Sequence, residues 1–293
     1  MPDAVRDRWA EWLLERRSGG DPQRRKQMQK ETEAFRERVL DNAQVRPDDV
    51  VLDVGAGDGL IAFGALDRLG PEGRVILSDI SQDLLDHTRS LAEEVGVADR
   101  CEFVLGAADD LEPFEDASVD VVTTRSVLIY LGREGKRRAF EEFHRVLRPG
   151  GRLSIFEPIN KFGFPPPPGW FCGYDLTAIP ELVAKVTAAV SPEGERTLID
   201  FDERDLLDWT RAAGFEVIRL QYEVTIEPGS WMAGPWETVL RSSGNPLAPT
   251  LGEAIEQALT PDEAKVFEAH LRPLVEANAG WRDAAVAYLR AVK

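Results

Sequence analysis

The fold of this 293-residue chain is decided by residues 50–59, Val-Val-Leu-Asp-Val-Gly-Ala-Gly-Asp-Gly. The first five are aliphatic apart from Asp53, which predicts a short strand buried on both faces of a parallel sheet. Glycines then alternate to residue 59, and Leu60–Leu66 continues at helical spacing. Because glycine accepts positive φ and lets a ligand approach the backbone closely, we expect a strand, a ligand-binding turn and a helix N-terminus.

The composition indicates a globular protein whose partners are small molecules. Hydrophobic residues make up 43% of the chain, and 35 basic against 52 acidic residues give a net charge of −17. That charge disfavours a nucleic-acid partner held by phosphate contacts. The two cysteines, Cys101 and Cys172, lie far apart, so we expect neither a metal site nor a disulfide framework. With no apolar run of transmembrane length and no signal-peptide core, we expect a cytoplasmic protein with no membrane partner.

A second buried strand is predicted over residues 73–79, and it ends in a carboxylate. Asp79 lies roughly 20 positions beyond Gly59, the spacing of an acid that accepts both hydroxyls of a ribose. A carboxylate suits this task because it offers two acceptor oxygens to two donors. The sequence therefore predicts a nucleoside-binding acid at the end of this strand.

Two further strands are predicted over Cys101–Leu105 and Asp120–Ser126. In open α/β sheets, ligands bind beyond the carboxyl ends of the strands. We therefore expect Arg125 and Ser126, at the end of the fourth strand, to lie near the ligands. A fifth strand is expected at Arg152–Phe156, after a helix over residues 133–148.

Together, the pattern Asp53-x-Gly55-x-Gly57-x-Gly59, the strand-end Asp79 and the run 148–151, Arg-Pro-Gly-Gly, resemble the motifs of class I S-adenosylmethionine (SAM) dependent methyltransferases. The resemblance covers residues 40–157 and, more loosely, 201–226 and 284–292. It implies an α/β fold with a Rossmann-like, doubly wound, seven-stranded sheet. It also implies SAM as the cofactor, with S-adenosylhomocysteine (SAH) as its product.

The resemblance also implies which residues contact the cofactor. The glycine turn would pack against the amino-acid part of SAM, and Ile80 would lie against the adenine. Relatives often carry an aspartate for the adenine amino group where this chain has Ala107, so we expect Asp109 or a backbone carbonyl to take over that contact. The expected cofactor residues are Asp53, Gly55, Ala56, Gly57, Gly59, Asp79, Ile80, Ala107, Ala108, Asp109, Arg125 and Ser126.

The chain divides into a sheet and the segments expected to cover its ligand-binding edge. We expect an N-terminal helical cap, a SAM-binding core, a substrate-side insertion, a core helix with a sixth strand, a helical insertion or lid, and a final core strand. Their respective ranges are 1–42, 43–157, 158–200, 201–227, 228–282 and 283–293. For the closing run 284–292 we expect a strand antiparallel to the fifth, with helix as the competing reading because alanine and leucine favour it.

Methyl transfer from a sulfonium is an in-line displacement that needs alignment and a dry pocket more than a covalent nucleophile. Aromatic residues of the insertions would roof that pocket, although burial of the insertions explains each of them equally well. These residues are Trp170, Phe171, Trp231 and Trp236. If the acceptor must lose a proton, the candidate catalytic residues are Glu157, Tyr130, Tyr174 and Asn160.

The resulting prediction is a SAM-dependent methyltransferase acting on a small-molecule acceptor, an aromatic natural product or secondary metabolite, through oxygen, nitrogen or carbon. The fourth strand leads to Thr-Arg-Ser-Val, residues 124–127, which disfavours methylation of nucleic-acid bases. One alternative is a SAM-binding protein without turnover. Another is an NAD(P)-dependent oxidoreductase, which Asp53 and Asp58 disfavour because acids fit poorly near a pyrophosphate. Tryptophans exposed on the insertions could also form a homodimer contact.

Overall fold

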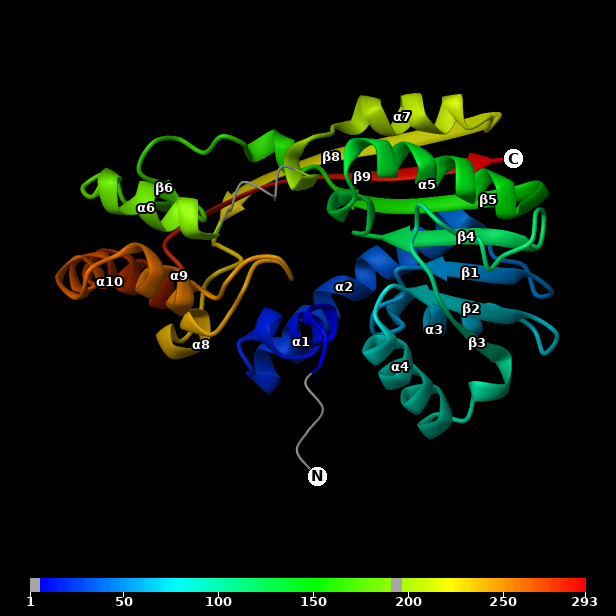
Figure 1. Ribbon diagram of the computed structural model, residues 1–293, viewed down its shortest axis with the longest axis horizontal. Helices are drawn as coiled ribbons and strands as arrows, with labels where there is room; N and C mark the ends of the chain where they lie inside the picture. Colours follow the sequence, from blue (N-terminus) through cyan, green and yellow to red (C-terminus); the bar gives the residue numbers. More distant parts are fainter. Residues whose placement is uncertain (1–5, 191–196) are drawn as a thin grey trace.

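The computed structural model describes residues 6–190 and 197–293, and in them seven strands pair into one mixed sheet (Figure 1). The strand order is β3-β2-β1-β4-β5-β9-β8; β1 to β5 are parallel, and β9 runs antiparallel to both of its neighbours. The strands are β1 (Val50–Val54), β2 (Arg74–Asp79), β3 (Cys101–Leu105), β4 (Val119–Arg125), β5 (Leu147–Pro158), β8 (Val217–Pro228) and β9 (Trp281–Val292). This confirms the predicted doubly wound sheet, whose strand order reverses between β1 and β4.

Two apolar cores lie on the two faces of this sheet. Leu52 and Val54 of β1 pack with α5 and α7, whereas Val51 packs on the other face with α2, α3 and α4. All five residues of β1 are buried, as expected for a central strand of a parallel sheet. The covering helices are α2 (Pro22–Ala43), α3 (Leu60–Leu66), α4 (Gln82–Glu94), α5 (Arg133–Val146) and α7 (Glu203–Ala212).

The N-terminal segment begins with α1 (Arg8–Leu14), which contacts α4, and the short helix η1 (Arg16–Ser18), which contacts α2. Asp7 caps α1 by accepting the amides of Trp9 and Ala10 at 2.9 and 3.0 Å. The other oxygen of Asp7 accepts the hydroxyl of Ser81, which directly follows β2, at 2.6 Å. The cap is therefore hydrogen-bonded to the carboxyl edge of the sheet. The first residues of the predicted cap, 1–5, lie outside the described residues.

The two insertions come together on the left of Figure 1, away from most of the sheet, and share one apolar core. Trp236 and Phe267 from the second insertion pack there with Phe171 and Tyr174 from the first. Residues 191–196 of the first insertion lie outside the described residues. The elements of the insertions are η4 (Asn160–Gly163), β6 (Trp170–Phe171), β7 (Tyr174–Asp175), α6 (Pro180–Val190), α8 (Trp236–Leu240), α9 (Leu251–Ala258) and α10 (Pro261–Glu276).

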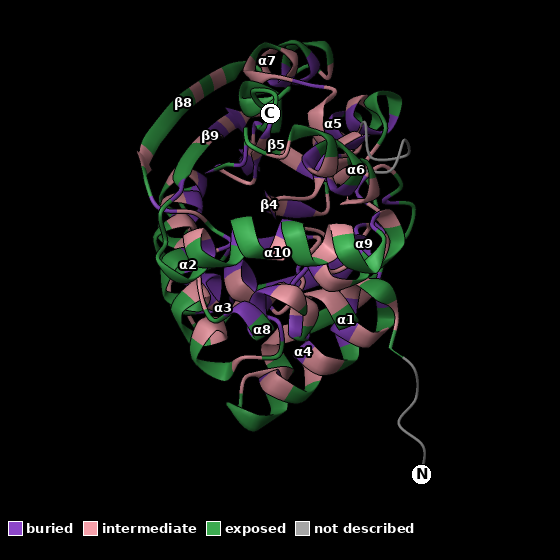
Figure 2. Ribbon diagram, turned by 90° about the vertical axis from the view of Figure 1, so that its left-hand side faces the viewer, coloured by how far each residue is buried: buried purple, intermediate pink, exposed green. Residues whose placement is uncertain are grey.

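The last strand, β9, lies between β5 and β8, so the competing helical reading of residues 284–292 is wrong. The edge strand β8 is largely exposed, as its colour in Figure 2 shows. Within the described part of the chain, every helix is too short or too polar to span a bilayer.

Candidate active site

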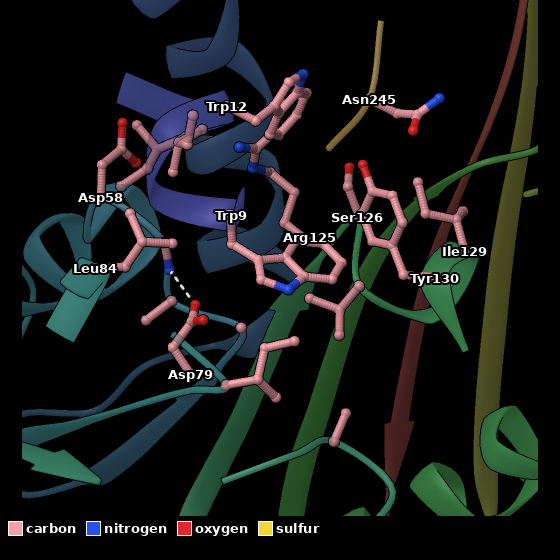
Figure 3. A pocket seen from close by; sticks show the side chains of 18 of the residues that line it. Trp9, Trp12, Asp58, Asp79, Leu84, Arg125, Ser126, Ile129, Tyr130 and Asn245 are labelled. Atoms are coloured by element: carbon pink, nitrogen blue, oxygen red, sulfur yellow. Dashed lines mark hydrogen bonds between the residues drawn. The ribbon is translucent and has the colours of Figure 1, made fainter. Parts of the chain in front are cut away.

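A cavity of about 550 Å³ lies at the carboxyl edge of the sheet, between the glycine turn after β1 and the N-terminal cap (Figure 3). Every predicted cofactor residue lines it except Gly59 and Asp109. Its volume is typical of small-molecule sites. The sequence motifs that predicted a cofactor site therefore come together in one cavity.

Asp79, at the end of β2, is held at the cavity wall by two backbone amides. One carboxylate oxygen accepts the amide of Gly57 at 2.9 Å, and the other accepts the amide of Ser81 at 2.9 Å. Each oxygen keeps a further acceptor site for a ligand. Burial raises the pKa of this carboxyl, and the two amides partly counter that effect. These features fit an acid that accepts the ribose hydroxyls of SAM.

The turn after β1 is shaped by glycine and by Asp53. The amide of Gly55 donates to the carbonyl of Ser78 at 2.7 Å, and with a φ of +69° a side chain there would be strained. A Cβ on Gly55 would also lie 2.2 Å from Cγ2 of Val127. Asp53 accepts the Thr123 hydroxyl at 2.8 Å and the amide of Ala62 in α3 at 3.1 Å, so it joins β1, β4 and α3 beneath the turn. Burial raises the pKa of Asp53 to about 7.

Two predicted cofactor residues lie elsewhere. Gly59 is the N-cap of α3 in the left-handed conformation, and it faces Phe63 of that helix instead of the cavity. Asp109 accepts a guanidinium N–H of Arg138 on α5 at 2.6 Å and does not line the cavity. The expectation that Asp109 replaces the missing acid is therefore corrected, and Ala107 and Ala108 supply the wall of the cavity there.

Of the four candidate catalytic residues, Tyr130 and Asn160 line the cavity and Glu157 and Tyr174 do not. Glu157 is fully buried and accepts the amides of Val127 and Leu128 at 2.8 and 2.9 Å. Burial raises its pKa to about 7. Glu157 thus fixes the turn that carries Tyr130, and its carboxylate does not line the cavity. Tyr174 is buried in the core of the insertions.

The predicted aromatic roof is only partly present. Trp231 lines the cavity, whereas Phe171 and Trp236 are buried in the core of the insertions and Trp170 lies in the β6–β7 hairpin. Phe171 and Trp236 therefore serve the packing of the insertions, which was the alternative explanation for these aromatic residues. This leaves Trp231 as the one member of the predicted set that faces the cavity among the described residues.

Sequence reasoning expected the N-terminal cap and the second insertion to cover this edge of the sheet, but it named no cavity residue in the cap and did not name Asn245 in the second insertion. Trp9, Trp12 and Arg17 line the cavity, as does Asn245. The Trp9 ring meets the Tyr130 ring edge-on, with centroids 5.0 Å apart, and the indole N–H of Trp12 donates to the carbonyl of Ser243 at 3.0 Å. Both tryptophans lie on α1, within the helical cap predicted over residues 1–42. No local pattern marked Arg17 or Asn245, because their partners are distant in sequence.

The sequence relatives of this chain are methyltransferases. Residues 51–151 match the family model described as "Methyltransferase domain". The arsenite methyltransferase of Halobacterium salinarum is 32% identical over 189 residues, which cover 59% of this chain and 47% of that enzyme. This chain therefore spans about half the length of that relative. The ubiquinone/menaquinone biosynthesis C-methyltransferase UbiE of Vibrio vulnificus is 31% identical over 181 residues, which cover 61% of this chain and 68% of UbiE.

Two solved structures share the fold. The YcgJ protein from Bacillus subtilis superposes with a TM-score of 0.54 at 18% identity, covering 89% of this chain and 98% of that one. The cyclase SpnF superposes with a TM-score of 0.53 at 20% identity, covering 89% of this chain and 81% of SpnF. At this level of identity the two structures support the sheet topology alone, whereas UbiE and the methyltransferase domain carry the assignment. The chain belongs to the class I SAM-dependent methyltransferases, and SAM is its cofactor.

Proposed function

We propose that this methyltransferase acts on a small-molecule acceptor that contains an aromatic ring, such as an aromatic natural product or secondary metabolite. The observation that carries the proposal is the gathering of Trp9, Trp12, Tyr130 and Trp231 in the same cavity as the cofactor residues. Flat apolar rings bury large areas against such side chains. Figure 3 shows Asp79 and Tyr130 at opposite sides of the site, so the aromatic wall extends beyond the ribose-binding acid.

The cofactor would be held by the groups that already face the cavity. Asp79 would accept the ribose hydroxyls, and the backbone of Gly55 and Gly57 would pack against the amino-acid part of SAM. SAM supplies a methyl group bound to a positively charged sulfur. Aromatic faces tolerate that charge through cation–π attraction.

The chain's own contribution is positioning and the exclusion of water. Trp12 bridges the N-terminal cap to the second insertion through Ser243, so two segments far apart in sequence meet over the cavity. Holding reactants in line in such an enclosure can supply roughly 7–11 kcal/mol of the barrier reduction in the best cases. Glu157 lies outside the cavity and Asp53 is engaged below the turn. Of the four candidate catalytic residues, Tyr130 and Asn160 therefore remain beside the acceptor.

A small acceptor also agrees with the charge and with the relatives. The net charge of −17 opposes binding of a polyanion such as nucleic acid. The two relatives described above are named for arsenite methylation and for C-methylation in quinone biosynthesis, which concern small acceptors. Both observations support a small-molecule substrate for this chain as well.

The test has two stages. Calorimetric titration with SAM, SAH and NADPH should show binding of the two adenosyl ligands only. Incubation with SAM and a panel of phenols, aromatic amines and aromatic acids should then give at least one product heavier by a methyl group, and Trp231→Ala should lower its kcat/KM about tenfold or more while SAH affinity stays within about twofold. Binding of SAH together with turnover of aliphatic acceptors alone would contradict the proposal.

A further inference from the structure

Two guanidinium groups in the cavity lack a carboxylate partner. Arg17 comes from η1 in the N-terminal cap, and Arg125 from the end of β4. Neither forms an ion pair or a hydrogen bond with any residue in the described ranges 6–190 and 197–293. Other arginines of this chain are paired; Arg138, for example, binds Asp109 at 2.6 Å.

The surroundings of Arg17 make an unpaired charge costly. Its guanidinium carbon lies 5.5 Å from the centroid of the Trp12 ring, which attracts the cation but leaves its N–H donors without acceptors. Burial and the positive charge of Arg125 both lower the pKa of Arg17. Two like charges facing one partly apolar cavity are stabilised when an anion binds between or beside them.

A count of charges shows that the cofactor cannot compensate both arginines. SAM carries a single carboxylate, together with an ammonium group and the sulfonium. Asp58, which also lines the cavity, can face the ammonium group, and one arginine can bind the carboxylate. The second guanidinium then has no anion from the cofactor, and the sulfonium adds a further positive charge. A second ligand with a carboxylate would give this guanidinium an ion-pair partner.

The positions of the two arginines indicate which one serves the second ligand. Arg125 is the last residue of β4, and in Figure 3 its side chain extends beside Trp9 toward Trp12. Arg17 also lines a second cavity of about 580 Å³, which shares Trp231 and Gly244 with the first. Arg17 thus lies beside Arg125 and Asp58 on one side and, on the other, lines the second cavity into which the site continues past Trp231.

We propose that Arg17 binds a carboxylate of the acceptor, so that the acceptor is an aromatic acid whose ring packs against Trp231 and Trp12. The inference rests on the proposed function, since it specifies the acceptor of that site. A carboxylate matches the planar fork of a guanidinium with two parallel hydrogen bonds. A monoanion also pairs with the one guanidinium that the carboxylate of SAM leaves without a partner.

The experiment measures binding, independently of turnover. The SAH complex of the full chain is titrated calorimetrically with matched pairs of an acid and its neutral amide: benzoate and benzamide, 4-hydroxybenzoate and 4-hydroxybenzamide, cinnamate and cinnamamide. At least one acid should bind about tenfold or more tightly than its amide. In Arg17→Gln this preference should fall below about threefold, and Arg17→Lys should retain part of it because the charge remains.

The matched control is Arg8→Gln, which removes the same charge from an exposed position on α1 and should leave the preference unchanged. SAH affinity reports whether the cavity stays intact, and it should be within about threefold of wild type in Arg17→Gln. Loss of SAH affinity in Arg17→Gln would overturn the inference, because Arg17 would then serve the cofactor. Equal binding of acids and amides, or no binding of any acid at millimolar concentration, would overturn it as well.

The outcomes also separate this inference from the proposed function. An acid that binds through Arg17 but is never methylated would leave the anion site established and the proposed aromatic acceptor wrong. Methylation of neutral aromatic molecules with no preference for acids would give the reverse result.

Discussion

At the scale of single residues, backbone amides decide which carboxylates are available to a ligand. Asp79 accepts one amide on each oxygen and remains at the cavity wall, whereas Glu157 accepts two close amides on one oxygen and a longer one, 3.4 Å from Ile129, on the other. Both acids end a strand, and the sequence predicted both as site residues. The two acids differ in exposure to the cavity because the turn after β4, whose amides of Val127 and Leu128 donate to Glu157, covers that carboxylate.

Replacing Asp79 tests the ribose-binding role. Asp79→Ala removes the acceptors for the ligand and also those for the amides of Gly57 and Ser81. Since a hydrogen bond to a charged group contributes about 1.5–3 kcal/mol, we expect SAH affinity to fall roughly tenfold to a few hundredfold if one ribose hydroxyl loses its acceptor, and further if both do. Calorimetry measures the affinity, with the exposed Asp86→Ala as control. Unchanged affinity for SAH would exclude Asp79 from the cofactor site.

Glu157 should make the stability of the fold depend on pH. Its pKa is raised from 4.5 to about 7 by burial, so the folded chain holds a proton that the unfolded chain releases between these values. The stability of the wild type therefore falls as pH rises through this window. In Glu157→Gln nothing titrates at this position. The difference between the free energies of unfolding of wild type and variant should therefore change by up to about 3 kcal/mol, to the disadvantage of the wild type, as the pH rises from 4.5 to about 7.

Urea unfolding at several pH values measures this difference. The exposed Glu94→Gln is the matched control, since it removes a carboxylate outside any core. Parallel stability curves for wild type and Glu157→Gln would mean that Glu157 titrates normally in the folded chain.

At the scale of elements, the strands and helices with periodic apolar residues could be predicted, and those fixed by distant partners could not. β1 and α3 lie where the local pattern of residues 50–66 put them. The alanine-rich run of β9 favours helix locally, but β5 and β8 form backbone hydrogen bonds with it on both sides, which stabilises the strand. The short helices α8 and α9 were missed, because their apolar faces are completed by residues from the first insertion.

The docking of α1 should control how long the cofactor stays bound. Asp7→Ala removes the N-cap of α1, which is worth about 1 kcal/mol, and also the hydrogen bond from Ser81 at 2.6 Å. Because Trp9 and Trp12 on this helix line the cavity, we expect SAH to dissociate about tenfold faster, with a smaller change in its association rate. Stopped-flow fluorescence with SAH as ligand measures both rates.

The control for this variant is Asp21→Ala, which removes the N-cap of α2 by the same chemistry but has no contact with the loop after β2. A similar increase in the dissociation rate in both variants would assign the effect to general loss of helix stability, and not to the docking of α1.

At the scale of the whole molecule, the chain has one core on each face of the sheet and another inside the insertions. The sequence analysis expected two insertions, at residues 158–200 and 228–282, that carry the aromatic residues of the predicted roof. It could not tell which aromatics face the substrate, because that depends on how the two insertions, separated by α7 and β8, pack against each other. Trp236 turned inward to this packing and is 2% exposed, whereas Trp231 is 51% exposed and lines the cavity. A homodimer contact through the insertions stays a prediction, for which only Trp231 of these two offers an exposed ring.

This separation of cores predicts that the insertions unfold before the sheet when their own core is damaged. Phe267 is fully buried and meets Phe171 edge-on, with centroids 5.8 Å apart. Phe267→Ala should lower the free energy of unfolding by about 3–5 kcal/mol. The loss should fall on the insertions, because their apolar core contains no residue of β1 or β4. Hydrogen exchange in mild urea should therefore show protection lost from α6, α9 and α10 while β1 and β4 stay protected.

SAH affinity provides the second readout, because Asp79 and the glycine turn lie on the sheet and not on the insertions. It should fall by less than about threefold in Phe267→Ala, far less than in Asp79→Ala, and the exposed Val266→Ala should change neither property. If α10 and β1 lose protection together at one urea concentration, the cores form one cooperative unit. In that case the insertions could not open to admit an acceptor while the cofactor site stays folded, and the acceptor would have to enter through the cavity as it stands.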